Sequence, residues 1–460
     1  MLIAGPPKAV VDGTDVDAGL PPPRRGVAVA SVLMAMAMVV LDAGMASVAL
    51  PSISRALHIG PAQSVVVVTA YQAALVMTLL PAAALGERLG YRRMFAGGVG
   101  VFTAASTLSM LAPSLPWLAA ARFAQGLGSA AVMALGVALL RATVPNTMLG
   151  TAIGWNALTV ALVAAASPAV GAVVLAAGGW RWLYAVNLPI GIAVLIAART
   201  LPPAGGNGPR IDLRSIAGNA LGFASLVLGA ELLPTAPAVS AVLFLIAGRA
   251  LTWLIARERP KAAPLIPLDL LRRRAFRLSV LASICCFTGQ AAGMIALPFY
   301  LQQGLGLSPL RAGLYLTPWP LSVAAAATVT GRLADRYSTA WLCAVGGTLL
   351  ALGLSAAAAW PLQGDPRPCI PLAILCGLGF GLFQVPNNRN LLVSAPRNRA
   401  GAAGGMQGAA RLTGQTAGAL IMTLLFSTTS QHAAPRIGLA VGAAFALAAG
   451  LISTSRLRAD

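Results

Sequence analysis

Apolar runs about as long as a membrane-spanning helix recur from one end of the chain to the other, and they restrict its fold more than any other feature. The 460 residues are 58% hydrophobic and only 10% charged, and the mean hydropathy is +0.80. Unpaired backbone polar groups are costly inside a bilayer, so about 20 apolar residues in a row favour a spanning α-helix. The sequence therefore predicts an all-α polytopic protein in the lipid bilayer of the cell (plasma or inner) membrane.

Fourteen apolar runs qualify as predicted spans, and short connections separate them. The predicted spans are residues 27–50, 62–84, 94–112, 116–140, 149–177, 180–198, 213–233, 237–256, 276–299, 310–330, 338–360, 369–393, 401–426 and 434–455. They divide the chain into a flexible cytoplasmic tail (1–26), an N-terminal six-helix bundle (27–199), a linker with two extra transmembrane helices (200–256), a basic cytoplasmic loop (257–275), a C-terminal six-helix bundle (276–455) and a second cytoplasmic tail (456–460).

The positive charge of the chain is distributed unevenly between the connections. Most of the 32 Lys and Arg residues fall in the tails and in every second connection, whereas the alternate connections contain only Arg55, Arg181, Arg311, Arg367 and Arg436. Connections rich in Lys and Arg stay on the cytoplasmic side, so both termini are predicted to be cytoplasmic. This topology accounts for the formal net charge of +20 without a nucleic-acid partner.

The two predicted bundles share a short charged motif. Leu85-Gly86-Glu87-Arg88 follows the second span, and Leu333-Ala334-Asp335-Arg336 follows the tenth, at about the offset that separates the first span from the ninth. Parallel repeats of this kind occur in transporters, with the substrate between the halves. Charges beside a turn-forming glycine predict a cytoplasmic gate, although the arginines could serve only to fix topology. The residues assigned to this gate are Glu87, Arg88, Gly90, Arg92, Arg93, Asp335 and Arg336.

One carboxylate interrupts the first span. The run 27–50 is apolar apart from Asp42 and small hydroxyls. A charge at that depth costs at least ~2.5 kcal/mol, which indicates a functional residue, although a tolerated neutral acid is the alternative. Arg122 lies at a similar depth in the fourth span, so we expect the two to pair and to support loading and release of a proton. The alternative for Arg122 is a side chain that extends outward to the membrane surface.

Other polar or small residues in the spans are candidates for a site between the bundles. Ser167, Pro168 and Gly171 lie in a run of small residues, which permits close approach of another helix. Arg411 lies near the middle of a span, and the sequence leaves two roles open for it. It either attracts an anionic group or completes a polar network within the C-terminal bundle. The candidates for lining a substrate cavity are Tyr71, Gln72, Gln125, Asn156, Gln290, Asn387 and Arg411.

The sequence offers no catalytic or ATP-binding motif. Lys8 and Lys261 are the only lysines, and neither follows a glycine-rich loop, so a P-loop is absent. We find no metal-binding spacing and no Ser/His/Asp constellation, so we expect no enzyme activity, no metal and no cofactor. The expected energy source is an ion gradient. We expect the protein to work as a monomer whose partners are protons and a small-molecule substrate.

These motifs together resemble those of the major facilitator superfamily, and specifically of its fourteen-span drug:proton antiporter family. The resemblance covers nearly the whole chain and rests on residues 41–51, 83–93, 122–126, 180–191 and 264–272. It implies two six-helix bundles plus two extra helices, and proton-driven export of amphipathic or cationic drugs, biocides or toxic metabolites by alternating access. It also implies that Asp42 couples the proton and that Arg122 supports it.

The chain departs from the family pattern at several positions. Gly44 and Ser47 replace the usual Thr and Asn of the first-helix motif, and Ser167 and Ala172 replace glycines of the antiporter motif on the fifth helix. Because the motif on the fifth helix is altered, the sequence does not decide whether substrate and proton are strictly exchanged. Two other functions therefore stay open: a proton-linked uptake permease of the same fold, and a membrane sensor or assembly factor that transports nothing.

Overall fold

A computed structural model describes residues 19–206, 212–259, 268–360, 365–396, 400–430 and 432–456, and their regular structure is entirely helical. Most of the predicted tails and part of the predicted loop 257–275 lie outside these residues. The helices, in chain order, are α1 (Pro22–Ala56), α2 (Pro61–Leu89), α3 (Tyr91–Met110), α4 (Leu115–Thr143), α5 (Asn146–Gly178), α6 (Trp180–Ala185), α7 (Asn187–Ala197), η1 (Ala198–Thr200), α8 (Leu213–Leu232), α9 (Pro237–Glu258), α10 (Leu268–Leu271), α11 (Arg274–Phe299), η2 (Tyr300–Gly304), α12 (Pro309–Leu316), α13 (Pro318–Leu333), α14 (Thr339–Ala359), α15 (Cys369–Val393), α16 (Ala400–Thr428) and α17 (Ala433–Thr454).

Eleven helices in the described residues are long and apolar enough to cross a membrane. The predicted spans 94–112, 310–330 and 401–426 coincide instead with α3, with α12 followed by α13, and with α16. The count of fourteen spans therefore stays a prediction. Two predicted spans are each divided in two: α6 gives way to α7 at Val186, and α12 to α13 at Thr317. Proline explains both interruptions, because Pro189 and Pro318 supply no backbone N–H to the helical ladder.

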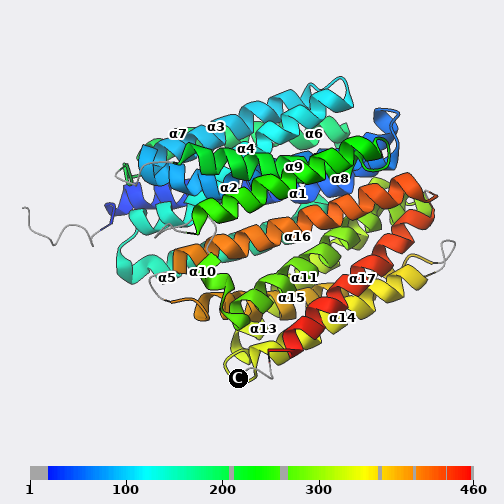
Figure 1. The fold of residues 1–460 in the computed structure, drawn as a ribbon. Helices are drawn as coiled ribbons and strands as arrows, with labels where there is room; N and C mark the ends of the chain where they lie inside the picture. Colours follow the sequence, from blue (N-terminus) through cyan, green and yellow to red (C-terminus); the bar gives the residue numbers. More distant parts are fainter. Residues whose placement is uncertain are drawn as a thin grey trace, which may run out of the picture.

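The helices form two groups, and Figure 1 shows α16 of the second group between α2, α8 and α9 on one side and α11, α14 and α17 on the other. Helices α1 to α7 pack with one another, and so do α11 to α17. The pair α8 and α9 lies outside the first group and is attached to α2: Thr69 donates a hydrogen bond to Glu231, and Asn219 Nδ2 donates one to the carbonyl of Met77 at 2.7 Å. Helix α8 also contacts α16, so the pair covers the edge where α2 meets α16.

Both chain ends of the described residues lie at one end of the bundle, here called the termini end. The backbone N–H of Leu20 donates to Thr143 at the end of α4, and Arg456 donates to Ser279 at the start of α11. The opposite end is called the far end. Because the termini end also carries the turn between α2 and α3 and the end of α13, the predicted gate residues lie there.

The two groups are joined by apolar packing at the far end. One cluster, the far-end cluster, contains Met45, Val48 and Leu50 of the first group together with Leu297 and Leu301 of the second. Towards the termini end each group has its own apolar cluster, and from the second group only Leu412 reaches that of the first. The far end is therefore closed by shared packing, whereas the cores of the two groups are separate at the termini end.

Two contacts reinforce the closed far end. Gln302 of η2 donates a hydrogen bond to the carbonyl of Val48 at 3.2 Å and accepts one from Arg55 at 3.4 Å. On the other side of the bundle, Gly313 of α12 packs so closely on α5 that an added Cβ would lie 2.8 Å from the carbonyl oxygen of Pro168 and 2.3 Å from the Cβ of Ala172. Small residues thus let the backbones of the two groups meet.

Candidate functional site

Asp42 is buried in the middle of α1. Buried residues recur on this helix at Ala35, Val39, Asp42, Ala46 and Ala49, a spacing that puts them on one face. The carboxylate is 2% exposed and lies on the face that packs into the first group. A buried charge is strongly unfavourable unless it is paired and hydrogen-bonded, so its partners decide whether it is tolerated.

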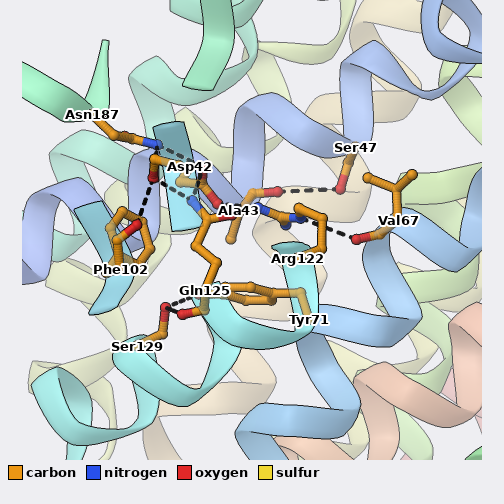
Figure 2. A network of polar contacts seen from close by, with 11 residues as sticks. Asp42, Ala43, Ser47, Val67, Tyr71, Phe102, Arg122, Gln125, Ser129 and Asn187 are labelled. Carbon is orange, nitrogen blue, oxygen red and sulfur yellow. Dashed lines mark hydrogen bonds and ion pairs between the residues drawn. The ribbon is translucent and has the colours of Figure 1, made fainter. Parts of the chain in front are cut away.

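Three side chains bind the Asp42 carboxylate. Arg122 of α4 donates from Nη1 to Oδ2 at 2.6 Å, which is the ion pair that the sequence predicted. Gln125 Nε2, one turn further along α4, donates to Oδ1 at 2.9 Å, and Asn187 Nδ2 of α7 donates to the same oxygen at 2.8 Å. Figure 2 shows Asp42 between Asn187 on one side and Arg122 on the other.

Arg122 is held as firmly as Asp42, and it is 1% exposed. Its Nε donates to the backbone carbonyl of Val67 at 3.1 Å, and its Nη1 also donates to Gln125 Oε1 at 2.6 Å. The guanidinium carbon lies 4.5 Å from the ring centre of Tyr71 and 5.6 Å from that of Tyr184, distances at which a cation is attracted to an aromatic face. The alternative that Arg122 extends to the membrane surface is therefore wrong.

A second set of hydrogen bonds surrounds the ion pair. Gln125 Nε2 donates to Ser106 Oγ of α3 at 2.9 Å, and Tyr71 donates to Ser129 Oγ of α4 at the same distance. The network therefore draws side chains from α1, α2, α3, α4 and α7 (Figure 2). A proton added to the carboxylate would cancel the charge that attracts Arg122 and so weaken the contact of α1 with α4.

The sequence did not single out Asn187, Ser106 or Tyr184 as site residues. Asn187 could have been noticed as the one amide at the start of the otherwise apolar α7. Ser106 gives no such signal, because serine occurs in many apolar helices of this chain as a donor to its own backbone. The contact is created by the packing of α3 on α4 and α7.

The antiporter-motif residues of α5 pack against α1. A Cβ on Gly44 would lie 1.9 Å from Ser167 Oγ, and a Cβ on Gly171 would lie 3.1 Å from the Cα of Met45. Ser167 therefore occupies the space that Gly44 leaves free. The two departures from the family pattern compensate each other, and α1 and α5 stay in close contact.

The predicted gate residues lie together at the termini end, but their contacts differ between the repeats. Gly90 joins α2 to α3 with a φ of +96°, a conformation that favours glycine. Arg92 donates to the carbonyl of Leu201 at 3.4 Å, whereas Glu87, Arg88 and Arg93 are exposed and no ion pair joins Glu87 to a described residue. In the second repeat Asp335 pairs at 2.6 Å with Arg389 of α15 rather than with the neighbouring Arg336.

The candidate cavity residues fall into three kinds. Tyr71 and Gln125 belong to the Asp42 network. Asn387 is tied within the second group, where it donates to the carbonyl of Ser279 and to Ser283 Oγ at 3.1 Å each. The remaining candidates are partly buried, and for three of them a buried polar atom has no hydrogen-bond partner in the described chain: Gln72 Oε1, Asn156 Oδ1 and Arg411 Nε.

Comparison with curated proteins finds relatives that are transporters. The chain is 40% identical to "Uncharacterized transporter YebQ" of Escherichia coli, over 95% of this chain and 97% of that protein. It is 32% identical to "Probable actinorhodin transporter" of Streptomyces coelicolor, over 92% and 77%. It is 27% identical to "Tetracenomycin C resistance and export protein" of Streptomyces glaucescens, over 86% and 75%.

Solved structures and a family model agree with these relatives. A crystal structure of a POT family transporter, in complex with a thioalcohol-conjugated peptide, matches 95% of this chain and 96% of its own with a TM-score of 0.74 at 15% identity, which shows a shared fold. The Major Facilitator Superfamily model matches residues 32–419. The activity common to this family is transport rather than catalysis, in a multi-pass protein of the cell membrane. The chain belongs to the Major Facilitator Superfamily.

Proposed function

We propose that the chain is a proton-coupled exporter of amphipathic small molecules, of the fourteen-span drug:proton antiporter type. The observation that carries this proposal is the buried Asp42–Arg122 pair with its two amide donors. An ionisable group kept inside a membrane protein at such expense is by default part of an ion or substrate pathway. The relative whose name includes resistance and export supports the outward direction.

The coupling step follows from the position of Asp42 on α1. When the carboxylate takes up a proton, it loses most of its attraction for Arg122, and α1 is held less firmly against α4. The same helix carries Val48 and Arg55, which bind Gln302 of the second group at the far end. A movement of α1 that follows protonation of Asp42 therefore also moves the α1 residues whose contacts close the far end.

The charge distribution supports a cytoplasmic termini end. Arginines of this end include Arg25, Arg88, Arg93 and Arg141, which lie in the first helical turn of α1 and around the ends of α2, α3 and α4. By the positive-inside rule the far end then faces the outside. In the state described here, a substrate would enter from the cytoplasm and protons would enter after the far end opens.

Reconstitution into proteoliposomes tests the proposal. With a panel of fluorescent amphipathic dyes and an imposed pH gradient, we expect wild type to move at least one dye uphill against the proton flow. Asp42→Asn should insert and fold but lose uphill transport, because the amide carries no exchangeable proton. Arg249→Gln, which removes an exposed arginine of α9, should transport as wild type does.

Three results would contradict the proposal. Uphill efflux by a correctly folded Asp42→Asn variant would remove this residue from proton coupling. Accumulation of dye inside intact cells, instead of extrusion, would favour the uptake permease. The absence of any transport in the wild type would favour a membrane sensor.

A further inference from the structure

Arg411 is a guanidinium in the membrane interior without an internal partner. It lies on α16, about 17 Å along the helix from Ala400 and about 26 Å from Thr428 at ~1.5 Å per residue, so it is well inside the helix. Its Nε is buried and makes no hydrogen bond, and no described carboxylate forms an ion pair with it. Of the two roles left open by the sequence, a network within the second half therefore has no support.

The environment of Arg411 is the contact between the two groups of helices. Helix α16 packs on α2, and a Cβ on Gly408 would lie 3.1 Å from Leu79. Leu412, the residue after Arg411, is the second-group side chain that joins the apolar cluster of the first group. Tyr71 of α2 belongs to that same cluster, and its ring lies against the guanidinium of Arg122. Arg411 thus lies across the interface from the Asp42 network.

An acceptor without a partner faces the same region from α2. Helices α2 and α16 run in opposite directions, and Gln72 precedes Leu79 by two turns on the same face of α2. Leu79 lies opposite Gly408, so the residue two turns earlier on α2, Gln72, lies at the level of the residue two turns later on α16, Gln415. Arg411 is one turn before Gln415, so Gln72 lies about one turn of α16 from Arg411. Gln72 Oε1 is buried without a hydrogen bond, as is Thr416 Oγ1 of α16. Buried polar groups in proteins are normally satisfied, so a donor and an acceptor left open together indicate a place for a ligand.

We propose that Arg411 binds the carboxylate of an amphipathic substrate between α2 and α16. This inference rests on the proposed export function and names its substrate class. A guanidinium offers several donors in a planar fork that matches a carboxylate, and removal of water strengthens that contact. The same charge repels lipophilic cations, so the site selects carboxylated compounds over cationic ones.

A pair of dyes that differ in one group tests the proposal. Rhodamine 110 has a free carboxylate, and rhodamine 123 is its methyl ester. Binding to the purified full-length protein in a neutral detergent, without any gradient, is measured by fluorescence anisotropy. We expect wild type to bind the acid about tenfold or more tightly than the ester, the range of a hydrogen bond to a charged group. Arg411→Gln should abolish this preference, and Arg411→Lys should retain part of it.

Two controls separate this proposal from the proposed function and from a structural role. Asp42→Asn should keep the preference for the acid even though it loses uphill transport. The proposed proton coupling and the proposed substrate recognition are therefore tested by separate results. Arg249→Gln should keep the wild-type preference, because this arginine is exposed on α9. In the absence of dye, Arg411→Gln should melt no lower than wild type, because it removes a charge that has no internal partner.

The proposal is overturned if wild type binds the two dyes equally or does not bind the acid. It is also overturned if Arg411→Gln keeps the preference, or if that variant melts well below wild type and so shows that Arg411 holds the helices together.

Discussion

At the scale of single residues, the shape of Arg122 matters as much as its charge. Its guanidinium donates from Nη1 to Asp42 and Gln125 and from Nε to the carbonyl of Val67, and it lies against Tyr71. A lysine ammonium can keep the charge but does not present the planar fork. The side chain therefore fixes the spacing of α1, α2 and α4, in addition to neutralising one carboxylate.

We predict that Arg122→Ala damages the protein far more than Arg122→Lys. The alanine variant leaves Asp42 buried without its cation, a loss of about 3–5 kcal/mol of stability for a buried pair. The measurement is thermal unfolding of the purified variants, with uphill dye transport in parallel. Adding Asp42→Asn to Arg122→Ala should recover part of the stability, because the unpaired charge is then gone. If the alanine and lysine variants both fold and transport as wild type does, the pair is not important for folding or transport.

At the scale of helices, the contact between α1 and α5 depends on a matched pair of positions. Gly44 has no side chain where Ser167 has one, and a Cβ at 1.9 Å from Ser167 Oγ is far inside van der Waals distance. We predict that Gly44→Ala lowers the melting temperature and slows transport, because overpacking of this kind typically costs about 1–3 kcal/mol.

The matched test is the double variant Gly44→Ala with Ser167→Gly. It restores the arrangement in which the small residue is on α5, so we expect both stability and transport to recover. Gly97→Ala is the control, because a Cβ there would meet nothing within 4 Å. If Ser167→Gly fails to rescue Gly44→Ala, the two positions are not coupled.

The sequence predicts helices better than it predicts contacts between them. Apolar length located the described helices, because it is a local property of the chain. The breaks at Val186 and Thr317 were not predicted, since proline also occurs inside continuous helices such as α1 and α5. The Asp42–Arg122 pair was predictable because each is the single charge in its span. Asn187 and Arg389 were missed as partners of Asp42 and Asp335 for the opposite reason: their roles arise from the tertiary packing of distant helices.

At the scale of the whole molecule, Gln302 of the second group hydrogen-bonds to the first group and so links the two groups at the far end. It is 8% exposed and bonds to Val48 and Arg55 of α1. We predict that Gln302→Ala shifts the resting population towards a far end that is open. Spin labels at the far ends of α1 and α11 would report this as longer distances in the variant than in wild type. Unchanged distances would mean that the far-end cluster alone keeps this end closed.

The electrical behaviour of the transporter follows from its single interior acid. In the two groups, and within the described residues, Asp42 is the one acid in the interior of a helix. We therefore expect one proton per substrate. Exchange of one proton for a monovalent cation moves no net charge across the membrane. Exchange for a neutral compound moves one charge, and exchange for a monovalent carboxylate moves two. The membrane potential acts on each net charge with about 2.3 kcal/mol per 100 mV.

Proteoliposomes in which the pH gradient and the membrane potential are imposed separately test this prediction. A neutral dye should respond to both, and a monovalent carboxylate should respond more steeply to the potential. A monovalent cation, if carried, should respond to pH alone. Uphill movement of such a cation by potential without a pH difference would show a second titrating group, for which Glu231 on α8, bonded to Thr69 of α2, is a candidate.

The far-end cluster also bears on energy conservation in the cell. Any protein that carries protons inward threatens to short-circuit the gradient that drives it. Met45, Val48 and Leu50 continue α1 outward from Asp42 and are fully buried, so apolar side chains stand between the carboxylate and the far surface. In the orientation proposed above, these buried apolar side chains separate Asp42 from protons outside the cell while this state persists. If the proposed coupling holds, we expect an idle transporter of this design to remain abundant in the membrane without draining the proton-motive force.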